Sequence, residues 1–515
     1  WSGAATTTIA TTMADTSSPP VALQFFEGAL WSAARSLLQA LLNVVALAVV
    51  ARELGPQAYG VFGVAMIVIS VAEMAVGGSF TESIIQRKDL HDGHIDATFW
   101  LTIAASVGAG ALIAALADPL ARMAGNADAA DVLTALACVL PLTVASRVPM
   151  ALLARDLRFR SISQIGALAS ILSCATGIAL ALHGTGVWTL VAMEGVRSAV
   201  NAVGAFVAVT WRPARRGRWA HLRELSRFNA GTFGTYAVGY ADLLLPRLLV
   251  SHLLGTQALG LFMLAVRVST ELSQLLTDPL HGVSMAACAR VQQARDELQR
   301  IVKGLYATSR LLVFPAYLGM AALAPTLVPW IFGPKWQPAV IAIQILMLGG
   351  VPRAHTAYNA AILFGVGRPH WTALLFGAGS LLHVALFPAL APWGLTGAAV
   401  AMLVRQYGTW PLSALLVSRA TGLTVRRQFE GSMPVLAAAA TMALVTAAVC
   451  HLLNAAAWHA AIVAIAAAGV GVVAYALVLR LVAPATLQTV FGLVRAFVRR
   501  DRTRLAELLS QPHGK

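Results

Sequence analysis

Long apolar segments follow one another along most of the chain and are separated by short polar turns. About 20 apolar residues are enough to cross the hydrocarbon core of a bilayer as a helix. The pattern predicts an all-α polytopic membrane protein with about 14 transmembrane helices. The approximate spans are 30–51, 58–79, 97–118, 130–152, 161–183, 187–210, 230–252, 258–286, 305–332, 338–364, 370–391, 394–417, 433–453 and 458–483.

Composition and charge fit this prediction. Hydrophobic residues make up 58% of the chain and charged residues 11%, whereas soluble proteins carry about 25% charged residues. The net charge is +15, and its positive residues concentrate in alternate loops, as cytoplasmic anchoring charges do. We therefore expect contact with membrane lipids and no nucleic acid, with both termini in the cytoplasm and an even number of spans.

The same pattern divides the chain into six parts. We expect residues 1–29 to form a disordered tail, with Met13 as a plausible translation start. No cleavable signal peptide is expected, because the first long apolar run continues as a span. The remaining parts are spans one to six at 30–210, a basic cytoplasmic linker at 211–229, spans seven to twelve at 230–418, spans thirteen and fourteen at 419–483, and a basic amphipathic cytoplasmic tail at 484–515.

Two segments repeat each other. Residues 51–66 read ARELGPQAYGVFGVAM and residues 251–266 read SHLLGTQALGLFMLAV, so that Gly55 and Gly60 align with Gly255 and Gly260 without a gap. Six spans separate the copies, which predicts parallel repeats related by an axis along the membrane normal. Glycine permits the tight helix–loop–helix turn that both copies require.

Three motifs resemble one family of membrane transporters. They are LGPxxYGxFG at 54–63, SFTESIIQR at 79–87 and YADLLLPRLLVSHLLG at 240–255. Over residues 30–480 the chain resembles oligosaccharide flippases of bacterial polysaccharide export, within the multidrug/oligosaccharidyl-lipid/polysaccharide exporter superfamily. The third motif in that family often has an Asp followed by a Gly-Arg pair. Here Asp242 and Arg247 occupy those places, and Pro246 replaces the glycine.

The resemblance implies an architecture and a task. Such proteins form two six-helix lobes in a V around a central cavity, and some members carry two extra C-terminal helices. They move undecaprenyl-pyrophosphate-linked repeat units across the bacterial inner membrane by alternating access, for exopolysaccharide or lipopolysaccharide biosynthesis. A polysaccharide polymerase and export machinery are possible partners.

Arginines interrupt the apolar segments. Each costs roughly 2.5–3.5 kcal/mol at the centre of a membrane helix on an insertion scale, so a wet cavity or a partner is required. Guanidinium binds phosphate oxygens in a bidentate way and stays charged when partly desolvated, whereas all four lysines lie in loops or tails. These arginines therefore predict a cationic substrate-binding cavity for an anionic cargo: Arg35, Arg147, Arg197, Arg247, Arg267, Arg353 and Arg405.

Carboxylates inside the apolar segments are candidates for ion coupling. Arg197 lies three residues after Glu194, and Glu271 lies four residues after Arg267, so each pair shares a helix face. Simple charge neutralisation and a functional role are both open for these pairs. Glu73 and Asp242 have no partner on their own helices, so we expect them to be unpaired. An unpaired intramembrane carboxylate suits binding of a proton or a sodium ion. Glu73, Asp242 and Glu271 are the predicted coupling residues.

Four alternatives remain open. A multidrug-type antiporter would line its cavity with carboxylates and aromatic rings, whereas arginines outnumber acids here. A peptidoglycan-precursor transporter would also use arginines, and only the LGPxxYGxFG motif argues against it. A membrane-embedded polymerase or ligase would need a sizeable external loop, and no predicted external loop reaches 20 residues. A structural scaffold would have no use for buried charges. We expect no catalytic residue, metal or cofactor, because the sequence contains no CxxC pair and no histidines at ligand spacing.

Overall fold

A computed structural model describes residues 21–77, 84–85, 89–123, 126–214 and 219–482. Within these ranges the side chains of 21–41, 123, 219–237, 278–283 and 286 are outside the description. The predicted tails and the SFTESIIQR motif therefore fall wholly or largely outside the described residues, and so does the side chain of Arg35. Of the basic linker, residues 215–218 lie outside the description, and residues 219–229 are described as helix without their side chains.

Helices account for all the regular structure of the described residues, as the sequence predicts. In chain order they are α1 (Val21–Gly77), α3 (Asp92–Ala115), α4 (Ala117–Met123), α5 (Ala129–Ala145), α6 (Arg147–Arg155), α7 (Phe159–Leu182), α8 (Trp188–Ala208), α9 (Trp219–Arg290), α10 (Arg295–Phe332), η1 (Pro334–Trp336), α11 (Ala339–Leu348), α12 (Gly350–Thr356), α13 (Asn359–Gly365), α14 (Pro369–Leu390), η2 (Ala391–Trp393), α15 (Gly394–Thr421), α16 (Val425–Gln428), α17 (Ser432–Ala455) and α18 (Ala460–Val482).

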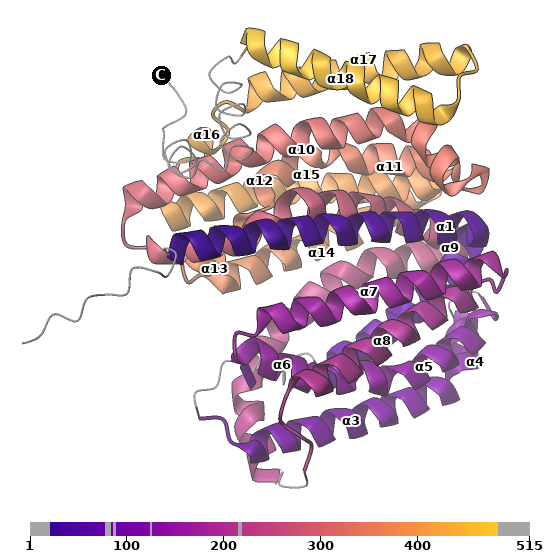
Figure 1. Ribbon diagram of the computed structural model, residues 1–515, viewed down its shortest axis with the longest axis vertical. Helices are drawn as coiled ribbons and strands as arrows, with labels where there is room; N and C mark the ends of the chain where they lie inside the picture. Colours follow the sequence, from indigo (N-terminus) through magenta and orange to yellow (C-terminus); the bar gives the residue numbers. More distant parts are fainter. Residues whose placement is uncertain (1–20, 78–83, 86–88, 124–125, 215–218, 483–515) are drawn as a thin grey trace, which may run out of the picture.

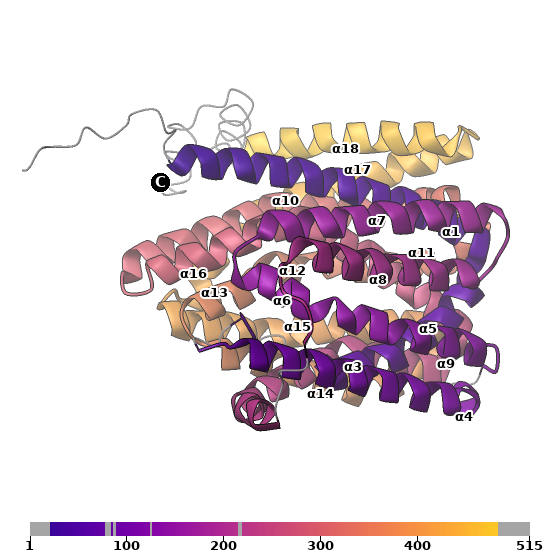
Figure 2. The same ribbon diagram turned by 60° about the horizontal axis from the view of Figure 1, so that its bottom comes forward.

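The helices form two neighbouring bundles with nearly parallel axes. Helices α3 to α8 lie together on one side, and α10 to α15 lie on the other (Figure 1). The long helices α1 and α9 pack against each other and connect the two bundles (Figure 2). Helices α17 and α18 form a hairpin that packs on α10 at the outer side of the second bundle. This arrangement keeps the last hairpin away from the contact between the bundles.

Ten helices in the described part of the chain are long and apolar enough to cross a membrane, or eleven if the bent pair α11 and α12–α13 is one span. Four of the ten contain an internal break. Gly55 interrupts the first at a φ of 78°, and Gly255 interrupts another at a φ of 86°. Ser146 separates α5 from α6, and η2 separates α14 from α15. A multi-pass membrane protein is confirmed, and the number fourteen stays a prediction.

The two repeated turns are the point where α1 and α9 cross. Gly55 and Gly255 adopt the same left-handed backbone conformation, which glycine reaches without the steric cost of a Cβ atom. One turn further on, a Cβ atom added at Gly60 would lie 2.6 Å from the carbonyl carbon of Thr256, and one at Gly260 would lie 2.8 Å from that of Pro56. The two backbones are thus in direct contact, and each repeat supplies one glycine.

Further contacts tie the bundles together at this crossing, which we call the closed end. The Thr256 hydroxyl lies 3.4 Å from the side-chain nitrogen of Gln57 and 3.2 Å from that of Asn126, and both amides can donate to it. The indole of Trp336 donates to the backbone oxygen of Ala51 at 2.8 Å. The side chains of Thr256, Asn126 and Trp336 are buried at this contact, whereas Gln57 is exposed at its edge.

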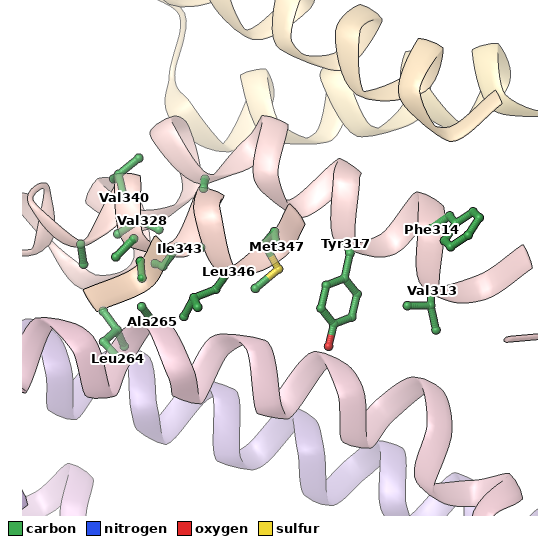
Figure 3. Close-up of a cluster of buried hydrophobic side chains, with 14 of the residues drawn as sticks. Leu264, Ala265, Val313, Phe314, Tyr317, Val328, Val340, Ile343, Leu346 and Met347 are labelled. Carbon is green, nitrogen blue, oxygen red and sulfur yellow. The ribbon is translucent and has the colours of Figure 1, made fainter. Parts of the chain in front are cut away.

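A large apolar core holds the second bundle together. Figure 3 shows side chains from α9, α10 and α11 meeting in this core, among them Leu264, Ile343 and Met347. Tyr317 extends from α10 toward α9, where its hydroxyl donates to the backbone oxygen of Ser269 at 3.1 Å. This bond fixes the phenol at the border between the core and the polar region described next.

Candidate functional site: an arginine-lined cavity

A cavity of about 250 Å³ lies inside the second bundle, between α9, α11, α12, α13, α14 and α15. One wall is the broken span, in which α11 and α12–α13 meet at Gly349 with a bend of 46°. Discontinuous helices mark binding sites in many transporters, because the freed backbone groups need a polar surrounding.

Two of the predicted arginines line this cavity. Arg353 lies one turn after the break and Arg405 lies on α15. The Nε atom of Arg353 lies 3.4 Å from the Tyr317 hydroxyl, a long hydrogen bond to a neutral group. The structure thus brings together two cations that are 52 positions apart in the sequence.

Arg405 is paired with an acid. It binds Asp242 of α9 at 2.9 Å, and both side chains are mostly buried, with 18% and 13% of their surface exposed. Ser380 of α14 donates to the other oxygen of Asp242 at 3.1 Å. A Cβ atom at Gly379 would come within 3.4 Å of both Arg405 and Asp242. Three helices therefore converge on this pair, and glycine leaves the room that it occupies.

The first bundle contains a second group of charges. Arg147 of α6 binds Glu73 of α1 at 2.8 Å, and both side chains are about one fifth exposed. Arg197 pairs with Glu194 on α8, as the three-residue spacing predicts. Both members of the α8 pair act electrostatically on Glu73. These two arginines and two carboxylates form one cluster without net charge.

The remaining two arginines lie on either side of the Gly255 break. Arg267 pairs with Glu271 at 2.6 Å, as their four-residue spacing predicts, and half of the arginine side chain is exposed. Arg247 has no hydrogen bond or ion pair within the described residues, and the charge acting on it is that of Arg267. A cation without a partner at this position is costly unless an anion or water reaches it.

The expectation that Glu73 and Asp242 are unpaired is wrong. Their partners are 74 and 163 positions away, on other helices. Spacing along one helix reports only partners three or four positions apart, so these pairs were invisible to it. Sequence reasoning also missed Tyr317 and Ser380 as members of the site, because their partners Arg353 and Asp242 lie on other helices.

The arginines do not all line one cavity. Arg353 and Arg405 do, Arg147 and Arg197 form the cluster in the first bundle, and Arg247 and Arg267 lie on the two halves of α9. In the part of the chain that the structure describes, no three His, Cys, Asp or Glu side chains are grouped to hold a metal ion.

Comparison with known proteins places this geometry in a family. Residues 49–341 match the family model described as "Polysaccharide biosynthesis protein". The succinoglycan biosynthesis transport protein ExoT of Rhizobium meliloti is 24% identical over 363 residues, which cover 70% of this chain and 73% of ExoT. The lipopolysaccharide biosynthesis protein WzxC of Escherichia coli is 25% identical over 333 residues, 64% of this chain and 67% of WzxC.

Solved structures agree on the fold. The lipid II flippase MurJ in an inward closed conformation superposes with a TM-score of 0.72 at 11% identity, over 87% of this chain and 97% of MurJ. An inward-facing multidrug resistance MATE transporter of the MOP superfamily gives a TM-score of 0.57 at 16% identity, over 76% of this chain and 99% of the transporter. The predicted all-α transporter fold is confirmed. Because the family model covers more than half of its length, this chain belongs to the polysaccharide biosynthesis protein family.

Proposed function

We propose that this protein is a flippase that moves undecaprenyl-pyrophosphate-linked oligosaccharide repeat units across the bacterial inner membrane by alternating access. The arginine-lined cavity beside the broken span carries the proposal. Relatives named for succinoglycan transport and lipopolysaccharide biosynthesis support it, and so does the likeness in fold to transporters.

The intramembrane charges suit a diphosphate. Of the seven predicted arginines, six have described side chains, and four of these pair with a carboxylate. Arg247 and Arg353 remain uncompensated among the described groups. Each phosphate of a diphosphate diester keeps one ionised oxygen, so the two negative charges of the cargo match the excess of two cations among these six arginines and their four carboxylates. A cationic drug has the opposite sign, which argues against the multidrug-type alternative.

The pair of Arg405 and Asp242 gives the cavity a way to couple cargo and ion. Diphosphate that binds Arg405 competes with Asp242 for the guanidinium. A carboxylate left without its partner at this depth takes up a proton or a sodium ion, because an isolated buried charge is costly. We propose the same exchange for Glu73 and Glu271, whose arginine partners are Arg147 and Arg267.

We propose that the lobes are residues 30–210 and 230–418, linked by 211–229, with 419–483 as an added hairpin and tails at 1–29 and 484–515. Both termini then lie in the cytoplasm, and the closed end faces the periplasm. No catalytic step or cofactor is needed, because the cargo is moved and not changed. A polymerase and export machinery would receive the cargo on the far side.

Transport by the purified full chain in proteoliposomes tests the proposal. The substrate is a polyprenyl-diphosphate-linked oligosaccharide, and its access to an external sugar-modifying enzyme measures translocation. Arg353→Gln and Arg247→Gln each remove a charged hydrogen bond to phosphate, which is worth about 1.5–3 kcal/mol, or roughly ten- to 150-fold in binding. Arg290→Gln, at an exposed position outside the candidate spans, is the matched control. Equal transport by all three variants and the unaltered protein would contradict the proposal.

A further inference from the structure

The position of Arg353 depends on the short helix α12. Its side chain lines the cavity and makes one hydrogen bond to the described residues, the long contact of 3.4 Å with Tyr317. A weak bond of this kind does not fix a long side chain, so the guanidinium goes where the backbone of α12 places it. A binding group has to be held within roughly 0.5 Å of its productive position. Whatever holds α12 therefore controls what Arg353 can bind.

The start of α12 is held by close packing on both sides. A Cβ atom added at Gly350 would lie 2.5 Å from the Cβ atom of Tyr317 on α10. One added at Gly349 would lie 2.5 Å from the side-chain oxygen of Gln406 on α15. These glycines let the break lie directly against two long helices, so the first residues of α12 have little room to move.

The end of α12 is held by a chain of hydrogen bonds through His355. Its Nε2 atom lies 3.2 Å from the Ser432 hydroxyl, and its Nδ1 atom lies 3.1 Å from the backbone oxygen of Val351. Arg310 of α10 donates to the same hydroxyl at 3.2 Å. Arginine only donates and a carbonyl only accepts. A neutral imidazole here therefore donates from Nδ1 to Val351 and accepts the Ser432 hydroxyl at Nε2.

This chain is shielded from water. The residues Arg310, His355 and Ser432 are 6%, 3% and 5% exposed. The imidazole packs against the ring of Phe429, with the two centroids 4.5 Å apart. The guanidinium of Arg310 also donates to the backbone oxygen of Gln428 at 2.9 Å. A buried cation is costly without partners, so Arg310 fixes the segment that leads into α17.

Helix α17 begins at Ser432 and is the first helix of the C-terminal hairpin. The hairpin packs on the outer side of α10, away from the first bundle (Figure 1), and supplies none of the described residues that line the cavity. Its first residue nevertheless bonds to His355, which lies two positions after Arg353. Residues two apart on a helix point about 200° away from each other. One side of α12 thus faces the cavity while the other side is fixed to the hairpin.

We infer that the α17–α18 hairpin positions Arg353 for the diphosphate of the cargo, through Ser432 and His355. Both are positioning residues, because neither lines the cavity. The inference rests on the proposed function, in which Arg353 binds diphosphate. It gives the hairpin a task in cargo recognition that it performs from outside the bundle.

Binding of cargo to the purified full chain in nanodiscs tests the inference. The cargo is a polyprenyl-diphosphate-linked oligosaccharide, and its Kd is measured for Ser432→Ala and His355→Phe, each with and without Arg353→Gln. A phenyl ring suits the aromatic surroundings of His355 and lacks both hydrogen bonds. Asn454→Ala is the matched control. It removes a hydrogen bond of 2.9 Å to Thr326 of α10, at the other end of α17.

The expected result depends on Arg353. Ser432→Ala and His355→Phe each raise the Kd by about three- to tenfold, comparable with the loss of one neutral hydrogen bond. In the Arg353→Gln background the same substitutions change the Kd by less than about twofold, because the group that they position is gone. Asn454→Ala leaves the Kd unchanged, and thermal unfolding in the same nanodiscs shows which variants are folded.

Three outcomes would overturn the inference while the proposed function stands. They are an unchanged Kd in both positioning variants, an equal rise with and without Arg353, and an equal rise in Asn454→Ala. Each would mean that the hairpin adds only general stability. If Ser432→Ala does not fold, His355→Phe gives the same comparison from the α12 side. Failure of the unaltered chain to bind the cargo would instead contradict the proposed function itself.

Discussion

Substitution of Gly60 by alanine tests whether the glycine crossing controls access. The added Cβ atom would lie 2.6 Å from the carbonyl carbon of Thr256, whereas carbon atoms pack best at about 3.5–4.0 Å. Both partners are helix backbone, so no flexible side chain can yield. The oxygen of that carbonyl lies nearer still to the added atom, so helices α1 and α9 must separate by more than about 1 Å at the closed end before the new methyl group fits.

The expected magnitude follows from the cost of overpacking. Inserting a methyl group into a well-packed contact costs about 1–3 kcal/mol. The cost applies only in the closed state, in which α1 and α9 touch at the closed end. The equilibrium between this state and an open state, in which the two helices are apart, therefore shifts by roughly 5- to 150-fold toward the open state. Gly260→Ala makes the reciprocal clash with Pro56, and we expect it to act in the same direction.

A buried thiol reports the opening. Thr256→Cys places a sulfur where only 8% of the native side chain is exposed, in a background whose four native cysteines are replaced. Its reaction rate with a membrane-impermeant maleimide, applied to each membrane face in turn, measures exposure. We expect Gly60→Ala to increase the rate from one face and to lower transport. Gly304→Ala, whose Cβ atom would meet nothing within 4 Å, should leave both unchanged. Equal labelling rates of the Gly60→Ala and Gly304→Ala variants would refute control of access by the glycine crossing.

Three further predictions concern stability, and thermal unfolding in nanodiscs measures each. Asp242→Asn and Arg405→Gln each leave a partly buried charge unpaired and should lower the free energy of unfolding by up to about 3–5 kcal/mol. The double variant should lose less than the sum of the two single losses, and strict additivity would contradict the pairing. His383→Leu should raise the unfolding temperature, because the imidazole is fully buried with no partner at either nitrogen; a lower temperature would show that the ring is needed. Trp336→Phe should destabilise by about 1–3 kcal/mol through loss of the buried bond to α1, whereas exposed Trp458→Phe should not.

Local patterns were enough to predict the helices and some of the charges. Membrane helices satisfy their own backbone groups, so length and hydropathy of a segment predict its structure. The ion pairs Glu194–Arg197 and Arg267–Glu271 followed from spacing on one helix. The repeated glycine turn was also visible, because left-handed backbone conformations favour glycine wherever they occur.

Only the tertiary structure decided which distant groups meet. Asp242 is 163 positions from Arg405, and Glu73 is 74 from Arg147, and nothing in either local pattern names the partner. Contacts between helices depend on how whole bundles pack, which periodicity along one helix does not encode. The cavity arises in the same way, from residues of six helices with a broken span at its wall. The sequence by itself determined a membrane-embedded helical chain with costly internal arginines. Packing decided that two of the arginines with described side chains remain uncompensated among the described groups, and that one of these, Arg353, shares a cavity with neutral hydroxyl groups.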